Sequence, residues 1–187
     1  MTLKNPVADK IILGLDPGTS VMGYGIILIR NQELKLLQFG VIHLKKYVGY
    51  ELKLKKIFER VNQIIEEFMP DEVALEAPFF GKNVQSMLKL GRAQGVAMAA
   101  ALAHEIPITE YAPKKVKQSV TGNGNASKEQ VAAMVQNLLK FKETTYLLDA
   151  TDALAVAICH HFQGQTNVKK TQGWGAFLSE NPKRLKS

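Results

Sequence analysis

The sequence predicts a layered α/β domain in which a five-stranded mixed sheet is flanked by helices. Three apolar runs with short polar connections come first, and apolar residues then recur in alternation at helical and strand spacing. The 187 residues suffice for one domain with a substantial core. A content of 46% hydrophobic and 22% charged residues is typical of a globular protein rather than of a disordered chain or a coiled coil.

The first part of the chain predicts three antiparallel strands. Residues 11–15 form an apolar run that ends in an Asp-Pro-Gly turn, as expected of a buried strand. Residues 23–29 and 34–44 form the next two apolar runs, separated by a turn at 30–32. Because tight connections join consecutive strands, we expect an antiparallel meander.

From residue 52 onward the sequence predicts helices and strands in turn. Steps of three and four residues between apolar side chains predict an amphipathic helix over 52–68. Small and apolar residues on more than one side predict a long helix over 84–104. Short apolar runs predict strands over 73–75 and 107–111.

The last third is expected to begin with a loop and to end in two helices. The segment 112–126 is rich in lysine and glycine and is expected to form a loop. Ser127 with Gln130 three residues later is typical of a capping box, which begins a helix through Leu139. A final helix is expected over 148–162.

Domain organisation, charge and cysteine content favour an intracellular protein. We expect one domain over 1–165 with a flexible arm at 1–9, and a flexible basic tail over 166–187.

With 24 Lys and Arg against 17 Asp and Glu, the net charge of +7 suits a polyanionic partner, although solubility alone explains it equally well. The single cysteine, Cys159, excludes an internal disulfide. Because neither a secretory signal nor a membrane-spanning run is evident, we expect a cytoplasmic protein without a membrane partner.

Four carboxylates occupy positions where α/β sheets gather functional groups. Asp16 ends the first expected strand and Glu76 the fourth, and sites in such sheets lie at the carboxyl ends of strands. Asp149 and Asp152 are three residues apart and can share one helix face. Taken singly, these acids are equally well explained as turn or helix-start residues. If the first and fourth strands are neighbours, however, the acids converge.

Converging carboxylates would need cations. Clustered carboxylates repel one another and raise each other's pKa unless positive charge neutralises them. Oxygen ligands select hard ions such as Mg²⁺ or Mn²⁺. Two such ions about 3.5–4 Å apart would stabilise the attacking and leaving oxygens of a phosphodiester. We therefore expect a nuclease with two Mg²⁺ ions per active site, for which Mn²⁺ is a plausible substitute.

Several short motifs between residues 11 and 161 occur in a distinctive order. They are LGLDPG (13–18), GYG (23–25), LE (75–76) followed by Phe79, KN (82–83), LKLGRAQG (88–95), VKQ (116–118), GNG (122–124) with Lys128, and DATDALA (149–155). As an ordered set these motifs resemble the RuvC family of Holliday junction resolvases, the crossover junction endodeoxyribonucleases. The resemblance implies a ribonuclease H-like fold.

The resemblance also implies a mechanism. Asp16, Glu76, Asp149 and Asp152 would be the catalytic metal ligands, with Asp16 contacting both ions. Water would attack phosphorus and leave a 5′-phosphate and a 3′-hydroxyl. The expected function is the resolution of Holliday junctions by symmetric nicks in two opposing strands, in recombination and repair.

Further positions are implied to contact DNA. Phe79 would stack on bases opened near the junction centre, and Phe80 would either help it or lie in the core. Lys117 and Lys128 would approach the scissile phosphate or the DNA backbone, and the alternative is a solvated charged loop, which suits Lys114 and Lys115 best. The remaining positions with an implied DNA contact are Lys82, Asn83 and Asn123.

The same resemblance implies protein partners. The helix expected over 84–104 is similar to the family's dimerisation helix, and a twofold homodimer would nick a four-way junction symmetrically. The sequence alone equally allows this helix to be buried within one domain. The family also works with a branch-migration complex, the RuvA and RuvB proteins.

Three alternative functions remain open at this stage. A different ribonuclease H-like nuclease, acting for example in RNA processing, would use the same carboxylates. Residues 15–20 also look like the first phosphate loop of actin-like and sugar-kinase-like ATP-binding proteins, but such proteins need two lobes and about twice this length. A catalytically silent DNA-binding protein is the third alternative.

Overall fold

One mixed β-sheet forms the centre of the molecule. The computed structural model describes residues 9–78, 83–142 and 148–170, with side chains as far as residue 164. Within these residues five strands lie in the order β3-β2-β1-β4-β5. The strands are β1 (Lys10–Asp16), β2 (Val21–Arg30), β3 (Glu33–His43), β4 (Glu72–Glu76) and β5 (Ile108–Tyr111). The first three pair antiparallel, as expected of the meander, whereas β1 with β4 and β4 with β5 pair parallel.

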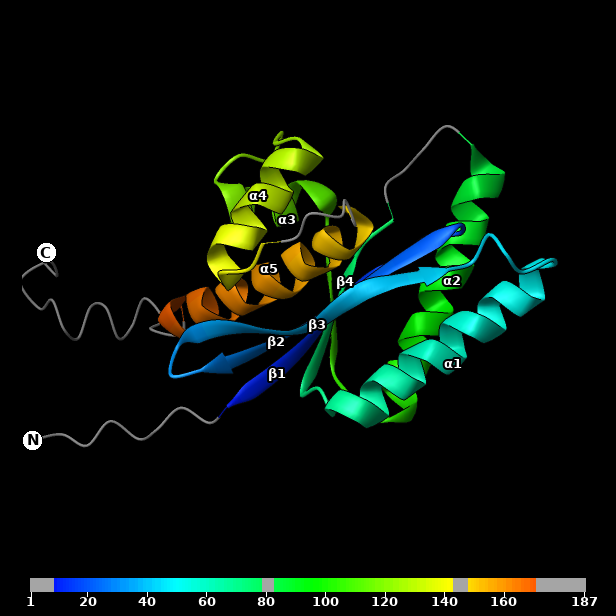
Figure 1. Cartoon of the computed structure of the whole chain (residues 1–187), viewed down its shortest axis with the longest axis horizontal. Coiled ribbons are helices and arrows are strands. Elements are labelled where there is room, and N and C mark those ends of the chain that lie inside the picture. Colours follow the sequence, from blue (N-terminus) through cyan, green and yellow to red (C-terminus); the bar gives the residue numbers. More distant parts are fainter. Residues whose placement is uncertain (1–8, 79–82, 143–147, 171–187) are drawn as a thin grey trace, which may run out of the picture.

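Helices cover both faces of this sheet (Figure 1). In the described part of the chain they are α1 (Tyr50–Phe68), α2 (Val84–Ala103), α3 (Pro113–Thr121), α4 (Lys128–Leu139) and α5 (Leu148–Lys170). The side chains of α1 and α2 share one hydrophobic core with the sheet, and those of α3, α4 and α5 share another. The predicted layered α/β architecture is confirmed.

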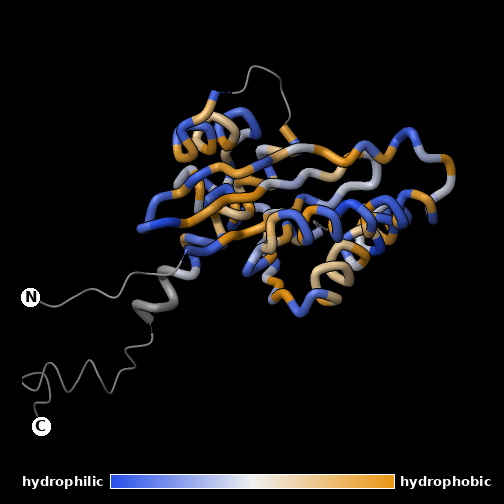
Figure 2. Tube along the Cα trace, turned by 60° about the horizontal axis from the view of Figure 1, so that its bottom comes forward, coloured by the Kyte–Doolittle hydropathy of each residue, from blue (hydrophilic) through white to orange (hydrophobic). Residues whose placement is uncertain are grey.

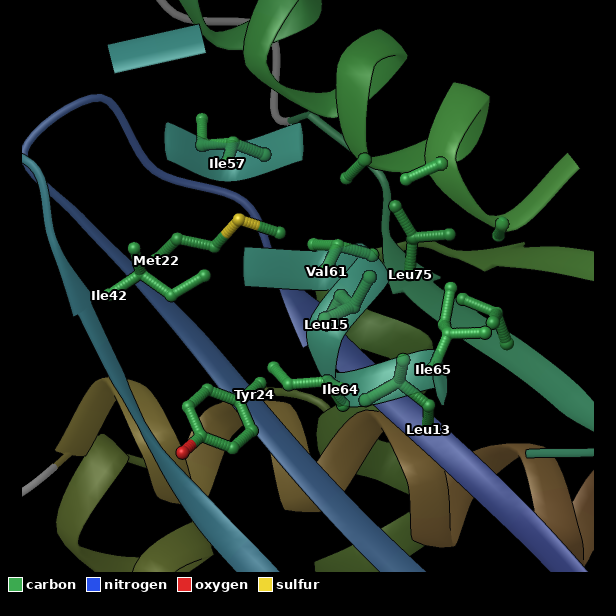
Figure 3. Packing of buried hydrophobic residues seen from close by; sticks show 14 of the residues in the cluster. Leu13, Leu15, Met22, Tyr24, Ile42, Ile57, Val61, Ile64, Ile65 and Leu75 are labelled. Carbon is green, nitrogen blue, oxygen red and sulfur yellow. The ribbon is translucent and has the colours of Figure 1, made fainter. Parts of the chain in front are cut away.

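The amphipathic spacing of α1 explains its place on the sheet. Its residues Ile57, Val61 and Ile64 follow one another at steps of four and three, and all are at most 1% exposed. They pack on Leu13 and Leu15 of β1, as Figure 3 shows. Burying such a side chain stabilises the fold by about 1.5–3 kcal/mol. In Figure 2 the central strands are coloured mainly hydrophobic, whereas α1 alternates along its length.

The apolar run of β1 reflects its central position. Ile12 contributes to the core beneath α5, whereas Leu13 contributes to the core beneath α1. Because successive side chains of a strand point to opposite faces, a strand covered on both faces is apolar at every position.

Glycines let α5 approach the sheet closely. A Cβ atom at Gly14 would lie 2.1 Å from the carbonyl oxygen of Ala153, and one at Gly25 would lie 2.6 Å from Cδ2 of Leu154. Both distances are too short for a side chain, so only glycine allows this packing. As a result α5 runs along the sheet with its first turn near the end of β1 (Figure 1).

The structure corrects the sequence prediction in two places. The segment expected to be a loop over 112–126 contains α3, which begins with Pro113 at its first turn and ends at Gly122, whose φ is 78°. Proline at a helix start and glycine just past its end are helix signals, but the lysine-rich sequence obscured them. The last helix extends to Lys170 instead of ending at 162, and so crosses from the expected domain, which ends at 165, into the expected basic tail, which begins at 166.

No helix among the described residues combines the length and the hydropathy needed to cross a lipid bilayer.

Candidate active site

The topology brings the ends of β1 and β4 together. These strands are parallel neighbours, and Leu15 is paired with Leu75 one residue before each strand ends. Asp16 and Glu76 therefore lie side by side at one edge of the sheet. Because Ile12 and Ala74 face α5, the alternation of side chains places both acids on the α5 face as well.

The first turn of α5 supplies the other two carboxylates. Asp149 and Asp152 lie on its surface toward the sheet edge, and the carboxylate oxygens of Asp16, Asp149 and Asp152 come within 4.8 Å of one another. Glu76 lines a pocket of about 160 Å³ together with Asp16. The negative charge of Asp152 also acts on Glu76. The four predicted acids thus converge, although they are up to 136 residues apart, the interval from 16 to 152.

Burial and mutual repulsion make Asp16, Glu76 and Asp152 hard to ionise. Burial, followed by the charges of Glu76 and Asp152, raises the pKa of Asp16 from 3.8 to about 8. Burial and the charge of Asp152 raise the pKa of Glu76 from 4.5 to about 7. Burial also raises the pKa of Asp152, although its hydrogen bond with Lys128 opposes this shift. The cluster therefore needs added positive charge to be fully ionised at neutral pH.

One lysine already supplies part of that charge. The Nζ atom of Lys128 donates a hydrogen bond to Oδ2 of Asp152 at 2.7 Å and lies 3.6 Å from Oδ1 of Asp149. Lys128 is the first residue of α4, which begins with the predicted capping box between Ser127 and Gln130. The cap therefore fixes where the helix begins and directs this lysine toward the carboxylates.

The donor chemistry of the cluster fits a hard divalent cation. Every ligand atom is a carboxylate oxygen, which suits Mg²⁺, Mn²⁺ or Ca²⁺ and not a soft metal. The raised pKa values show that the site lacks enough positive charge of its own. The residues present therefore fit a divalent metal.

The structure also locates other residues singled out in the sequence. Lys117 lies on α3 rather than in a loop, and it donates a hydrogen bond to the carbonyl oxygen of Ala126 at 2.8 Å. Its positive charge partly opposes the rise in the pKa of Glu76. Asn123 lies in the turn after α3, where its Oδ1 accepts a hydrogen bond from the amide of Asn125. Asn83 caps α2 by accepting from the amide of Ser86. The positions outside the described residues are Phe79, Phe80 and Lys82.

Gln94 is a site residue to which sequence reasoning gave no role. Its side chain is 5% exposed, lines the pocket of Asp16 and Glu76, and donates to Oε1 of Glu110 at 3.1 Å. The sequence did carry a signal for this role, because Gln94 lies among small apolar residues in an expected helix. A buried side-chain amide there needs a hydrogen-bond partner.

Comparisons with known proteins agree with this geometry. The family model for "Crossover junction endodeoxyribonuclease RuvC" matches residues 12–160. The chain is 65% identical over 180 residues to the protein of that name from Cytophaga hutchinsonii, covering 96% of this chain and 90% of the relative. It is 56% identical over 185 residues to the one from Bacteroides fragilis, covering 97% and 98% respectively.

A solved structure supports the same relationship. Thermus thermophilus RuvC, in complex with Holliday junction substrate, has a TM-score of 0.79 and 31% identity, over 84% of this chain and 96% of that one. The five-stranded mixed sheet with flanking helices agrees with the ribonuclease H-like fold that the motifs imply. On these grounds the chain belongs to the RuvC family of crossover junction endodeoxyribonucleases.

Proposed function

We propose that this protein resolves four-way DNA junctions by cutting two opposing strands, in recombination and repair. The convergence of Asp16, Glu76, Asp149 and Asp152 at the sheet edge is the observation that carries the proposal. Family membership supports it, because the relatives bear the name of crossover junction endodeoxyribonucleases and one is described with a Holliday junction substrate.

The four carboxylates act by holding divalent cations, which we take to be two Mg²⁺ ions with Mn²⁺ as a substitute. Asp16 is the best candidate for the ligand shared by both ions, because the charges of the other three acids all act on it. When bound, such ions activate the attacking water and stabilise the charge that develops on the phosphodiester oxygens. The expected products are a 5′-phosphate and a 3′-hydroxyl.

Basic residues beside the carboxylates would position the DNA. Lys128 partly compensates the charges of Asp149 and Asp152, and bound cations would release its ammonium group to contact a phosphate. Lys117 lies within electrostatic range of Glu76 and Asp152 and would also contact a phosphate. The other positions proposed to contact DNA are Phe79, Phe80, Lys82, Asn83 and Asn123.

The surface of α2 supports a homodimer. Exposed apolar or small side chains recur along one side of the helix, at Val84, Leu88, Gly95, Ala99 and Leu102. A glycine inside a helix costs about 1 kcal/mol relative to alanine. In the described part of the chain nothing lies within 4 Å of a Cβ added at Gly91 or Gly95. A second helix approaching closely would explain both glycines, as it would in a twofold dimer.

The remaining proposals concern the protein's organisation and surroundings. Residues 1–165 would form the nuclease domain and 166–187 a basic tail. The protein would act in the cytoplasm together with a RuvA and RuvB branch-migration complex, because the relatives share the RuvC name.

Incubation with a mobile four-way junction and Mg²⁺ tests the proposed function. We expect paired nicks at opposing positions that can be religated directly. The substitutions Asp16→Asn and Glu76→Gln should each reduce cleavage at least about 10³-fold while junction binding persists, because they remove metal ligands without removing basic groups. Glu67→Gln, a change at an exposed acid of α1, is the matched control and should leave cleavage unchanged.

Parallel reactions with linear duplex, RNA–DNA hybrid and structured RNA test substrate class. Faster cutting of an RNA substrate, or cleavage that survives both site substitutions, would contradict the proposal.

A further inference from the structure

Two hollows lie along the edge of α1, close to the carboxylate pocket. The nearer one, of about 300 Å³, lies between the turn after β1, the start of α1 and the second turn of α2. Its lining residues are Thr19, Ser20, Tyr47, Gly49, Tyr50, Lys53 and Lys89. The farther one, of about 290 Å³, lies between the end of β3 and α1. It is lined by Val41, Ile42, His43, Lys46, Tyr47, Lys56, Glu59, Arg60 and Gln63.

The two hollows adjoin each other and lie close to the carboxylate pocket. Pro17 lines the carboxylate pocket and Thr19 lines the nearer hollow, so the two lie close together on either side of the turn after Asp16. Tyr47 lines both the nearer and the farther hollow. In Figure 1 the end of β1, the connection from β3 and the start of α1 all lie at the same end of the sheet. We call the two hollows together the α1 groove.

The α1 groove is strongly basic. Its charged lining residues other than histidine are Lys46, Lys53, Lys56, Arg60, Lys89 and Glu59. Glu59 already pairs with Lys55 and Lys56, so its charge is largely compensated. In the described part of the chain Lys46, Lys53 and Lys89 have no carboxylate partner within ion-pair distance. The groove therefore presents net positive charge to solvent.

The cations are ordered along the path. Lys53, Lys56 and Arg60 follow one another at steps of three and four, so they share one face of α1 over about 10 Å. The ammonium groups of Lys46 and Lys56 lie 5.4 Å and 5.9 Å from the ring centroid of Tyr47, a distance at which the ring attracts cations. Tyr47 thus brings together Lys46, which precedes α1, and Lys56, which lies on α1.

We propose that the α1 groove binds the phosphate backbone of a duplex arm of the junction as that arm leaves the active site. The inference rests on the proposed function and adds a second contact region to it. A row of cations about 10 Å long matches roughly three phosphates at about 3.4 Å per step along the duplex axis. DNA is favoured over an acidic protein segment because a strand held at the carboxylates must leave across the surface next to them, and the groove lies close to that surface.

The double variant Lys46→Ala/Lys53→Ala tests this proposal by fluorescence anisotropy with a labelled four-way junction, in EDTA and over a range of salt concentrations. We expect at least about a tenfold rise in Kd. The slope of log K against log salt should become shallower by about 1.8, because each lost phosphate contact contributes about 0.9. Single-turnover cleavage at saturating protein should fall much less than the affinity does, because the carboxylates are intact.

The matched control is Lys35→Ala/Lys142→Ala, which removes the same charge from two exposed lysines outside the groove. This variant should keep the wild-type affinity and salt slope. If the groove variant also keeps both while wild-type protein cuts the junction, the groove proposal is wrong and the proposed function stands. If wild-type protein neither binds nor cuts the junction, both fail.

A crosslinking experiment maps the contact directly. The variant Lys53→Cys can be labelled with a photoreactive group, because the natural Cys159 is buried. We expect crosslinks to duplex arms several base pairs from the cleavage sites. Crosslinks confined to the junction centre, or none at all despite tight binding, would overturn the proposal.

Discussion

At the scale of single residues, Asp16 and Glu76 stand out because their pKa values are raised to about 8 and about 7. Burial is the main cause in both, and the charges of neighbouring acids add to it. Such a cluster is neutral in part when no metal is bound and becomes fully charged when cations compensate it. Metal binding and proton release should therefore be coupled at this site.

This coupling predicts how pH affects stability. In the unfolded chain Asp16 titrates near 3.8, whereas in the metal-free folded protein it titrates near 8. Between these values the folded state binds a proton that the unfolded state has released, so the stability present at low pH is lost as the pH rises toward 8. Calorimetry of metal-free protein should show Tm falling by several degrees from about pH 5 to about pH 8.

The same measurements with Mg²⁺ supply the control. The cation should raise Tm more at the higher pH, because it binds the deprotonated carboxylates. Asp16→Asn should reduce both the pH dependence and the metal effect. A wild-type Tm that stays level with pH, or a larger Mg²⁺ effect at low pH, would contradict the coupling.

Lys128 predicts a second effect on metal binding. Because its ammonium group occupies the space beside Asp149 and Asp152, it competes with divalent cations for the same oxygens. We expect Lys128→Met to tighten Mn²⁺ binding about tenfold in the absence of DNA, which corresponds to about 1.4 kcal/mol, and to slow junction cleavage. Isothermal titration calorimetry measures the affinity. Lys114→Ala, at an exposed lysine of α3, is the control, and unchanged or weaker Mn²⁺ binding in the Lys128 variant would refute the competition.

At the scale of elements, α5 determines whether the carboxylates meet. Near its start it supplies Asp149 and Asp152, and eight residues beyond Asp152 it is attached to the sheet by His160. The His160 ring bonds to the carboxylate of Glu72 on β4 and, at 2.8 Å, to the hydroxyl of Tyr111 on β5. These contacts, with the close glycine packing, fix the position of the helix along the sheet.

The packing of α5 on β1 gives a prediction at this scale. In Gly14→Ala the new Cβ would lie 2.1 Å from the carbonyl oxygen of Ala153, so the helix must move away. We expect a loss of about 1–3 kcal/mol in the free energy of unfolding. Cleavage should fall about 10²-fold, because displacement by about 1 Å is enough to misplace catalytic groups. Urea unfolding and single-turnover kinetics measure the two effects.

A second glycine of α5 provides the comparison. Gly164 has nothing within 4 Å of an added Cβ in the described structure. Gly164→Ala should therefore stabilise the protein by up to about 1 kcal/mol and leave cleavage unchanged. Equal effects of the two substitutions would show that close packing of α5 is not what positions the acids.

At the scale of the whole molecule, the exposed side of α2 should decide the oligomeric state. A leucine at position 95 would meet nothing in its own chain within the described structure, but it would hold a second helix away. We expect Gly95→Leu to convert a dimer into monomers in sedimentation experiments. Each chain should keep its fold, so its Tm should change little. Nicks in the two opposing strands should then become independent of each other.

The control for this experiment is Gly164→Leu, which places the same side chain on another exposed helical position. It should leave the protein dimeric. A wild-type protein that sediments as a monomer at micromolar concentration, or a Gly95→Leu variant that stays dimeric, would disprove the proposed interface.

The sequence by itself determined the local features of this protein. Strand and helix spacing identified the sheet, and the capping box at Ser127 located the start of α4 at Lys128. The strand-end positions of Asp16 and Glu76 were also readable, because turn residues and apolar runs are local signals. The helix α3 was missed because its lysine-rich surface outweighed the signal from Pro113.

Only the tertiary structure decided which of these features meet. Pairing of β1 with β4 joins segments about 60 residues apart, and no local pattern encodes that neighbour. The same holds for the burial of Gln94, the ion pairs of Lys128 and the closeness of the α1 groove to the carboxylate pocket. These properties depend on contacts between distant parts of the chain, and burial and electrostatic interactions arise only when folding removes water from between them.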